Sequence, residues 1–349
     1  MISNNAFFHQ VRFLIKEKRS FAAFRNPESN LLECYVSSDK IPKKEANPSG
    51  SGFIIKPFNP TSGGYLISSN NIVSTHYLKN KESRALSFFE EKFPLDFKKN
   101  KKQYIDDVTS IVDQISFSDL IKVVYSNCFE FPLKSENTIE YFKNILDLYP
   151  VAFCYLFFHP EEGFWIGASP ETLVEIQDNK ISTMALAGTK ILTDSNWSEK
   201  ELLEQKIVED EIKKTLNPHC QNLTSQELQT SKAGKIEHLK TLITGFTSKS
   251  PKEIVAALHP TPAVAGVPKN KAISIIAEKE KHDRSFYSGY LGKIDSKNCA
   301  LFVNLRCLQI KDNNARLFVG GGITKDSIPE KEWEEIIHKS QTMIDALFK

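Results

Sequence analysis

The stretch FWIGASPETLVEI, residues 164–176, with the apolar run that follows it to Ala187–Thr189, decides how this 349-residue sequence folds. Its first half alternates apolar and small residues, a pattern that predicts a β-strand. Because Pro170 cannot donate to a sheet ladder, we expect the strand to break or bend there, where it meets a cleft. Glu171 would then lie at an edge beside Trp165, where desolvation favours the neutral form that suits a proton donor. An ordinary glutamate in a turn is the alternative.

Strand-like runs on both sides of this stretch predict the fold class. Asp178 and Asn179 form the expected turn of a hairpin, and residues 151–158 read as a strand buried on both faces. Consecutive antiparallel strands interrupted by a few helices indicate an α+β fold with a large antiparallel sheet, in two lobes with a shared cleft. Further strands are expected at 121–133, 238–246, 286–295, 300–310 and 315–323, and helices at 104–115, 136–148, 198–216, 251–260, 269–281 and 329–348.

Composition narrows the class of protein. The chain has 45 basic and 43 acidic residues and a formal net charge of +2, which gives no electrostatic case for binding nucleic acid. No run of 18 apolar residues predicts a membrane span, and the N-terminal residues predict an amphipathic helix instead of a signal peptide. The six cysteines form no CxxC pair and lie mostly in apolar runs, so we expect buried free thiols and a cytoplasmic protein. The lysine-rich residues 97–103 are the best candidate for a linker.

The C-terminal part of the chain carries two features that suit a binding site. Glu335 and Lys339 are four residues apart on a predicted helix, so they share one face. Before that helix, Gly320, Gly321 and Gly322 end an apolar strand, where they let the backbone approach a ligand and present N–H groups to an anion. A surface ion pair and an ordinary turn are the corresponding structural alternatives.

Three further charged residues stand out from their surroundings. Glu204 lies on an acidic predicted helix, and it would form a Mg²⁺ site if it faced Glu335. Arg306 interrupts an apolar strand, so we expect an anionic substrate or a buried carboxylate to meet it. Lys122 opens another apolar strand, where a lysine has its pKa lowered and can serve as a base. A structural salt bridge competes with each of these hypotheses.

Taken together, these segments resemble the chorismate-utilising enzymes, which include isochorismate, salicylate, anthranilate and aminodeoxychorismate synthases. The likeness runs from about Lys122 to the C-terminus, and ten motifs follow the family's order: KVVYS, GASPETLVE, ALAGT, KELLEQ, HLKTLITG, LHPTPAVAGVP, DRSFYSGYLG, NLRC, RLFVGGGI and EWEEIIHKS. The resemblance implies two stacked, antiparallel-rich sheets with helices outside and the active site in the central cleft. We expect residues 1–100 to be a variable β-rich part of the same fold and residues 101–349 to be the chorismate-binding catalytic region.

Single positions within this resemblance favour one branch of the family. Lys122 stands where water-adding members have lysine, whereas the ammonia-using anthranilate branch usually has glutamine. Ala187 stands where the aminodeoxychorismate branch carries a nucleophilic lysine, and Ala263 where lyase and amino branches usually carry threonine. These positions favour an isochorismate synthase. Tyr287 favours a different branch, because this position is often phenylalanine in isochorismate synthases and the tyrosine is similar to the salicylate-forming lyases.

The resemblance implies a set of roles for the predicted reaction, the Mg²⁺-dependent conversion of chorismate to isochorismate. Lys122 would activate water for attack at ring C2 while Glu171 protonates the departing C4 hydroxyl group. Glu204 and Glu335 would hold Mg²⁺, and Arg306 and Lys339 would bind carboxylate oxygens. The remaining residues expected to line the substrate site are Ala187, Gly188, Thr189, His238, Ala263, Tyr287, Gly320, Gly321 and Gly322.

Two departures from the family pattern keep other hypotheses open. Asn127 stands where the family often has arginine, and Gln205 where histidine commonly follows the metal-binding glutamate. We interpret both as changes behind the site. The alternatives are a salicylate synthase, which adds pyruvate elimination, and a degenerate member that binds chorismate without turnover. We expect chorismate as the partner, no nucleic acid, no membrane, a monomer or weak dimer, and a product that feeds menaquinone or siderophore synthesis.

Overall fold

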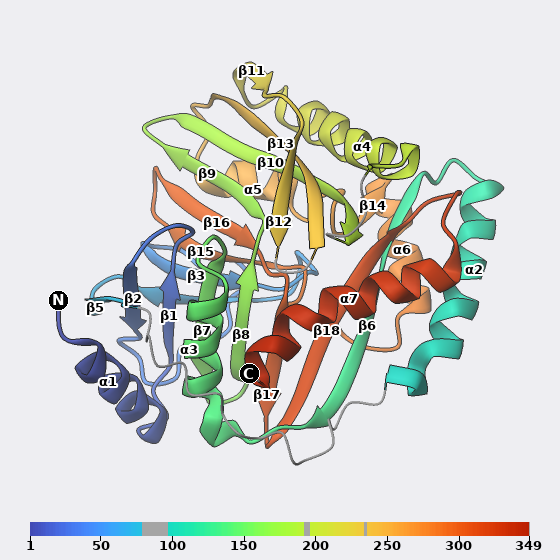
Figure 1. Cartoon of the computed structure of the whole chain (residues 1–349). Helices are drawn as coiled ribbons and strands as arrows, with labels where there is room; N and C mark the ends of the chain where they lie inside the picture. Colours follow the sequence, from blue (N-terminus) through green and yellow to red (C-terminus); the bar gives the residue numbers. More distant parts are fainter. Residues whose placement is uncertain (79–96, 192–195, 234–235, 349) are drawn as a thin grey trace.

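The computed structural model describes residues 1–78, 97–191, 196–233 and 236–348. Within these residues the chain forms two nine-stranded sheets in which every strand pair is antiparallel (Figure 1). The first sheet has the order β14-β6-β18-β17-β8-β7-β1-β2-β5, and the second has the order β11-β13-β10-β9-β16-β15-β3-β4, with β12 paired to β13. The predicted class, an α+β fold with two stacked antiparallel sheets, is therefore confirmed.

The strands of the first sheet come from both ends of the chain. They are β1 (Phe21–Arg25), β2 (Leu31–Val36), β5 (Ile72–His76), β6 (Lys122–Pro132), β7 (Phe153–His159), β8 (Gly163–Ser169), β14 (Gly266–Val267), β17 (Cys307–Lys311) and β18 (Asn314–Ile323). The second sheet contains β3 (Gly52–Lys56), β4 (Tyr65–Ser68), β9 (Thr172–Gln177), β10 (Lys180–Ile191), β11 (Gln221–Ser225), β12 (Gln229–Ala233), β13 (Ile236–Phe246), β15 (Tyr290–Ile294) and β16 (Cys299–Val303). Both sheets thus include strands from the first hundred residues.

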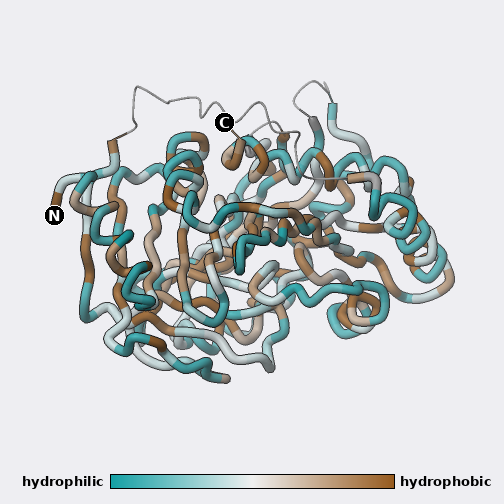
Figure 2. The backbone as a smooth tube through the Cα atoms, turned by 90° about the horizontal axis from the view of Figure 1, so that it is seen from below, coloured by the Kyte–Doolittle hydropathy of each residue, from teal (hydrophilic) through white to brown (hydrophobic). Residues whose placement is uncertain are grey.

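The helices lie on the outer faces of the sheets. The described helices are α1 (Asn4–Lys16), α2 (Lys101–Ser116), α3 (Thr138–Leu148), α4 (Glu199–Leu216), α5 (Pro251–Leu258), α6 (Lys269–Lys279) and α7 (Pro329–Leu347). Helices α4 and α5 share an apolar core with the second sheet, and the other five share one with the first sheet. In Figure 2 hydrophilic and hydrophobic residues alternate along the peripheral helices, as expected for helices with one buried face.

Aromatic side chains fill the space between the two sheets. Trp165 of β8 is fully buried, stacks on Phe318 with 5.5 Å between ring centroids, and meets Phe286 edge to face at 5.4 Å. Phe153 of β7 stacks on Phe302 of β16 at 4.1 Å and so joins the two sheets directly. Alternation along each strand supplies these rings to the inner face, while the opposite residues pack under the helices.

The chain crosses from one sheet to the other at two neighbouring places. Strand β8 ends at Ser169 in the first sheet, and β9 begins at Thr172 in the second, so the break predicted at Pro170 is confirmed. The return crossing separates β16 from β17, and the two crossings are joined by hydrogen bonds from Val303 N to Glu171 O and from Ala168 N to Arg306 O, both 3.0 Å.

The second crossing overturns one expectation. The single strand predicted over residues 300–310 is two strands in different sheets, and Arg306 lies between them with a φ of 49°. Asn304 stops the first strand because its side chain donates to Phe286 O at 2.9 Å and accepts from Tyr155 Oη at 2.7 Å. Arg306 therefore lies at a crossing and not inside a core strand.

Other local expectations can be compared with the structure in the same way. The hairpin turn at Asp178 and Asn179 is confirmed, with φ values of 50° and 66° that suit a two-residue turn. The linker predicted at residues 97–103 is wrong: residues 97–100 form a 3₁₀ helix, and α2 begins at Lys101. Strands β11 and β12 were not predicted from the sequence.

The six cysteines are free, and all except Cys220 are buried. No helix in the described ranges is long and apolar enough to span a membrane.

Replacement of Trp165 by alanine tests whether the aromatic layer holds the sheets together. Because the side chain is fully buried between rings from both sides, we expect Trp165→Ala to lower the free energy of unfolding by about 3–5 kcal/mol in urea titrations. The control is Phe117→Ala, at a residue that is 90% exposed, which should change it by less than about 0.5 kcal/mol. Equal effects of the two variants would contradict this role for the aromatic layer.

Candidate active site

A pocket lies where the two sheets meet at the crossings. Strands β6 and β18 of the first sheet and β10 and β13 of the second contribute to its wall, and α4 and α7 each send one charged side chain into it. It is lined by Lys122, Val124, Pro170, Glu171, Leu186, Ala187, Gly188, Thr189, Glu204, His238, Ala263, Val264, Tyr287, Ser288, Leu305, Arg306, Phe318, Val319, Gly320, Gly322 and Lys339. Segments more than 200 residues apart in the sequence thus converge on one site.

Most of the residues predicted for the site line this pocket, and two do not. Gly321 faces away from the pocket. A Cβ atom added to it would lie 3.5 Å from Glu335 Oε1 and 3.5 Å from Glu332 Oε2. Glu335 lines an adjoining groove between α7 and the start of α4, and that groove shares Thr189 with the pocket. Glu335 still contacts the pocket through Lys339, because its Oε1 lies 2.6 Å from Lys339 Nζ.

Three lysine–glutamate pairs occupy the region between α4, α7 and the first sheet. Lys122 Nζ lies 2.8 Å from Glu204 Oε1, and Lys200 Nζ lies 2.5 Å from Glu332 Oε1. The predicted pair of Glu335 and Lys339 is the third. The structural salt bridge that competed with the base hypothesis for Lys122 is therefore present, and its partner is the predicted metal ligand.

Lys200 and Glu332 were missed in the sequence. Both lie in motifs quoted above, KELLEQ and EWEEIIHKS, and Glu332 precedes Glu335 by three residues, one helical turn. That spacing is the signal that could have identified Glu332. Nothing local could have paired it with Lys200, which is 132 residues away in the chain.

Gly322 makes room for the first of these pairs. A Cβ atom at this position would lie 2.2 Å from Glu204 Oε1 and 2.8 Å from Lys122 Cε. Any side chain would therefore displace the carboxylate or the lysine from its present place. Gly188 has a different reason to be glycine, since its φ of 73° is in the left-handed region that favours glycine.

Glu171 is a carboxyl group held in its neutral form. Only 3% of the residue is exposed, and burial raises its pKa to about 8, while Lys122 and Lys339 oppose the shift. Its side chain is thus largely protonated at neutral pH, as expected for a proton donor.

The carboxylates beside the lysines differ from Glu171. Burial raises the pKa of Glu204, but the ammonium groups of Lys122, Lys200 and Lys339 outweigh burial and lower it overall. Burial and the neighbouring Glu335 raise the pKa of Glu332 to about 7 against the effect of Lys200. The site therefore contains an ionised carboxylate at Glu204 near two carboxyl groups with elevated proton affinity.

Arg306 is held without an acidic partner. It donates from Nη1 to Lys339 O at 2.8 Å and from Nη2 to His238 Nε2 at 3.0 Å. Within the described part of the chain no carboxylate lies within 4.0 Å of its guanidinium nitrogens, although the residue is only 8% exposed. The sequence predicted either a buried carboxylate or an anionic substrate as its partner, and the first alternative is not met here.

The arginine fixes the state of His238. Because a guanidinium can only donate, Nε2 of His238 must accept, so the proton is on Nδ1, which donates to Gly188 O at 3.1 Å. Burial, Arg306 and Lys339 lower the pKa of His238 well below its ordinary value. His238 is therefore a neutral orienting residue and not an acid.

The two departures from the family pattern lie outside the pocket wall. Gln205 is buried and donates from Nε2 to Thr241 Oγ1 at 2.8 Å, a contact between α4 and β13. Asn127 lines a polar pocket beside α2, and its buried Nδ2 atom has no hydrogen-bond partner among the described residues. No group of three or more His, Cys, Asp or Glu residues with metal-binding geometry occurs in the described ranges.

The histidine assignment is testable by nitrogen-15 NMR of the imidazole rings. We expect His238 to show a protonated Nδ1 and an unprotonated Nε2, and to stay neutral from about pH 8 to about pH 5.5, where an ordinary histidine becomes charged. His238→Gln identifies the resonances, and the exposed His9 serves as the internal reference. A protonated Nε2, or a charge change near pH 6.5, would contradict the contact with Arg306.

Comparisons with known proteins show which proteins this chain is similar to. The vibriobactin-specific isochorismate synthase of Vibrio cholerae is 29% identical over 262 residues, 70% of this chain and 66% of that protein. This chain thus spans slightly less than two thirds of that relative. A Bacillus anthracis structure described as a 2,3-dihydroxybenzoate-specific isochorismate synthase, DhbC, superposes with a TM-score of 0.81 at 23% identity, covering 97% of this chain and 99% of that one.

A second solved structure and a family model complete the comparison. MenF of Escherichia coli, the menaquinone-specific isochorismate synthase, superposes with a TM-score of 0.78 at 21% identity, covering 94% of this chain and 88% of that one. At these identities the superpositions show the fold alone. The model of the chorismate binding enzyme family matches residues 67–348, well over half of the sequence, and the chain therefore belongs to that family.

Proposed function

We propose that this protein is an isochorismate synthase that converts chorismate to isochorismate with Mg²⁺. The observation that carries the proposal is the presence, in one pocket, of a protonated Glu171 and of a buried arginine, Arg306, that forms no ion pair with a carboxylate of the described residues. Chorismate offers what these groups require, namely carboxylates for Arg306 and a hydroxyl leaving group for Glu171. The relatives named isochorismate synthase support the same reaction.

The reaction needs one base and one acid. Lys122 takes a proton from the water that attacks ring C2, while Glu171 gives its proton to the C4 hydroxyl group, which leaves as water. Atoms balance because one water enters and one leaves. Lys122 must be neutral to accept the proton, so its ammonium group, now paired with Glu204, first gives a proton to solvent. After turnover the proton gained by Lys122 must return to Glu171.

The other residues bind and orient the substrate. The guanidinium of Arg306 and the ammonium of Lys339 would each hold carboxylate oxygens, and His238 keeps the guanidinium in place from behind. Lys339 now donates to Gly320 O at 3.1 Å, so its ammonium already lies at the glycine edge of β18. Ala187 and Gly188 line the pocket without bulky side chains, which leaves room for the ring of the substrate.

The residues present fit a magnesium ion. Glu204 and Glu335 supply the carboxylate oxygens that Mg²⁺ prefers, and both act electrostatically on the same ammonium group, that of Lys200. Glu332 Oε2, which also lies near Lys200, is buried and accepts no hydrogen bond from a described residue. We propose that Glu204 and Glu335 hold the ion, with waters and substrate as the remaining ligands. When bound, Mg²⁺ would neutralise the substrate carboxylate and so stabilise the charge that develops on the ring.

A salicylate synthase is the second candidate. Tyr287 lines the pocket and is buried, and its hydroxyl oxygen would lie only 2.9 Å from a Cβ atom at Gly320. Ala263, which also lines the pocket, offers a methyl group where lyase members have a hydroxyl.

We propose that the product leaves as isochorismate for menaquinone or siderophore synthesis in the cytoplasm, and that the enzyme acts as a monomer or weak dimer.

Product analysis tests the proposal. Purified protein, chorismate and Mg²⁺ should yield isochorismate by chromatography, and EDTA should abolish the product. Salicylate with pyruvate would favour the second candidate, and bound but unchanged chorismate would favour a non-catalytic member.

Lys122→Ala should remove turnover while chorismate still binds. The control is Lys293→Ala, which removes a strand lysine from a carboxylate pair at 3.0 Å outside the pocket. Turnover retained in Lys122→Ala would remove the base assignment.

The pH dependence tests the acid. Because Glu171 must be protonated and its pKa in the substrate-free protein is raised to about 8, kcat/KM should fall as the pH rises above about 8. Glu171→Gln should lower kcat by about 10²–10⁴-fold and remove this basic limb from the residual rate. A wild-type rate that falls already above about pH 5, where an ordinary glutamate ionises, would contradict the assignment.

A further inference from the structure

A buried ion pair lies directly behind the pocket wall and touches none of the space inside it. Glu280 and Arg284 occupy the connection from α6 to β15, and both side chains are 3% exposed. Arg284 donates to the carboxylate from Nε at 2.8 Å and from Nη2 at 2.6 Å. Neither residue lines the pocket. The sequence reading did not single out either residue.

Arg284 uses its remaining donors on two residues that do line the pocket. Nη2 donates to Val124 O at 2.6 Å and Nη1 donates to Val264 O at 2.9 Å. Val124 belongs to β6, two residues after Lys122 and on the same face of the strand. Val264 follows Ala263, one of the positions that separate the family's branches. A single guanidinium thus joins strand β6, which carries the proposed base Lys122, to the loop that carries Ala263.

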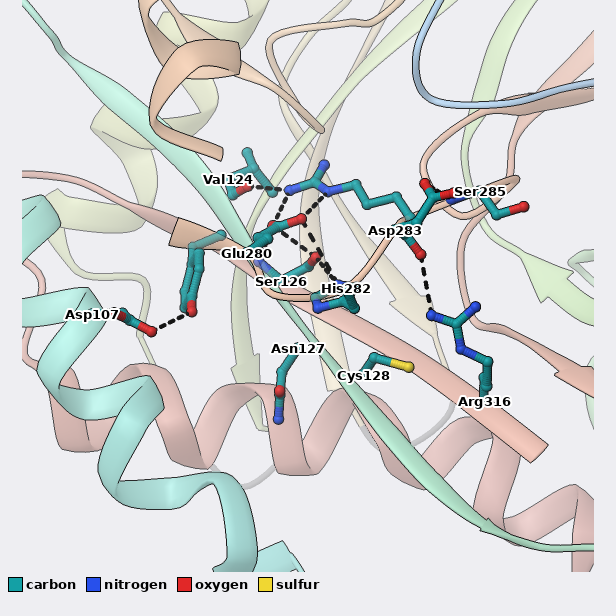
Figure 3. Close-up of polar contacts among 12 residues, drawn as sticks. Asp107, Val124, Ser126, Asn127, Cys128, Glu280, His282, Asp283, Ser285 and Arg316 are labelled. Atoms are coloured by element: carbon teal, nitrogen blue, oxygen red, sulfur yellow. Dashed lines mark hydrogen bonds and ion pairs between the residues drawn. The ribbon is translucent and has the colours of Figure 1, made fainter. Parts of the chain in front are cut away.

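Glu280 completes the connection to β6. Its Oε1 accepts from Ser126 N at 2.8 Å and from Ser126 Oγ at 2.7 Å (Figure 3). Ser126 also meets His282 Nε2 at 3.0 Å, in the same loop. Strand β6 pairs with β18 along one side, and on the other side it pairs with β14 only at Lys122 and Val123. Val124 N donates to Ala265 O at 2.9 Å on this second side, and the ion pair adds contacts there at Val124 O and Ser126 N.

The same arginine reaches a third part of the wall. The backbone N of Tyr287 donates to Arg284 O at 2.8 Å, and the guanidinium lies 5.9 Å from the centre of the Tyr287 ring. On its other side it lies 4.3 Å from the ring of Phe58, which keeps the guanidinium from moving away. The side chain of Arg284 therefore sets Val124 and Val264 relative to each other, and its backbone carbonyl and ring contact connect Tyr287 to them.

We propose that Glu280 and Arg284 are positioning residues, which hold Lys122, Ala263 and Tyr287 in the arrangement that turnover requires. The inference rests on the proposed function for its kinetic readout. The claim that these contacts hold the pocket wall does not depend on the proposed function, because they form whether or not chorismate is the substrate. Misplacement of reacting groups by about 1 Å can cost about 10²-fold in rate, so a small shift of β6 is enough to be measured.

Two variants separate positioning from stability. Arg284→Lys keeps a positive charge beside Glu280, but its single nitrogen has three N–H donors and cannot replace the four contacts that the guanidinium makes from three nitrogens. Glu280→Gln combined with Arg284→Met removes both charges, so that no unpaired charge is buried, and the thermal midpoint should fall only by what the lost bonds to Val124 O and Val264 O contribute. In both variants we expect kcat for chorismate to fall by roughly 10- to 100-fold, with a smaller change in KM.

The matched control is Arg25→Met. Arg25 is another buried arginine that donates to two backbone carbonyl oxygens, Leu146 O and Tyr149 O at 2.7 Å, and it does not line the pocket. Its loss should lower the thermal midpoint and leave kcat of the folded protein unchanged. If Arg284→Lys has wild-type kcat, or if its kcat falls only as far as that of Arg25→Met, the positioning role is overturned.

Hydrogen exchange keeps this test separate from the proposed function. In Arg284→Lys we expect faster amide exchange in residues 122–126 and 261–268 than in the wild type, with unchanged exchange in β1. Unchanged exchange in both segments would overturn the inference even in an active enzyme. A wild type without turnover would count against the proposed function alone, and the exchange result would still decide whether the ion pair holds the wall.

Discussion

The whole site depends on the two places where the chain passes between the sheets. At Pro170 and again between Val303 and Cys307 a strand ends in one sheet and the chain continues in the other. Backbone hydrogen bonds join the two crossings, so neither can shift alone. Each crossing places one ionisable side chain at the pocket, Glu171 at the first and Arg306 at the second. A buried acid and a buried cation are thereby set beside each other by backbone topology.

Electrostatics then divides the buried carboxyl groups by role. Glu171 has no direct lysine contact within salt-bridge distance among the described residues, and burial keeps it protonated. Glu204, in contact with Lys122, is ionised. The glycine edge of β18 lets these charged groups approach the backbone closely. The same residue type is thus protonated at one position and ionised at the other because its surroundings differ, as the proposed proton donor and the proposed metal ligand require.

Sequence reasoning succeeded where the physical signal is local. Proline cannot pair in a ladder, so the break at Pro170 could be predicted, and the four-residue spacing predicted that Glu335 and Lys339 would meet. It failed at Asn304, because the apolar pattern is the same on both sides and the contacts that stop the strand come from Tyr155 and Phe286. Partners far apart in the chain, such as Lys200 with Glu332 and Arg306 with His238, leave no local pattern at all.

We propose that Lys122 and Glu171 exchange a solvent water for the C4 hydroxyl group of chorismate. Turnover of chorismate in water enriched in oxygen-18, followed by mass spectrometry of the product, shows whether this exchange takes place. We expect isochorismate that carries one oxygen from solvent, at ring C2. Isochorismate without solvent oxygen would rule the exchange out, since the hydroxyl group would then have moved within the substrate.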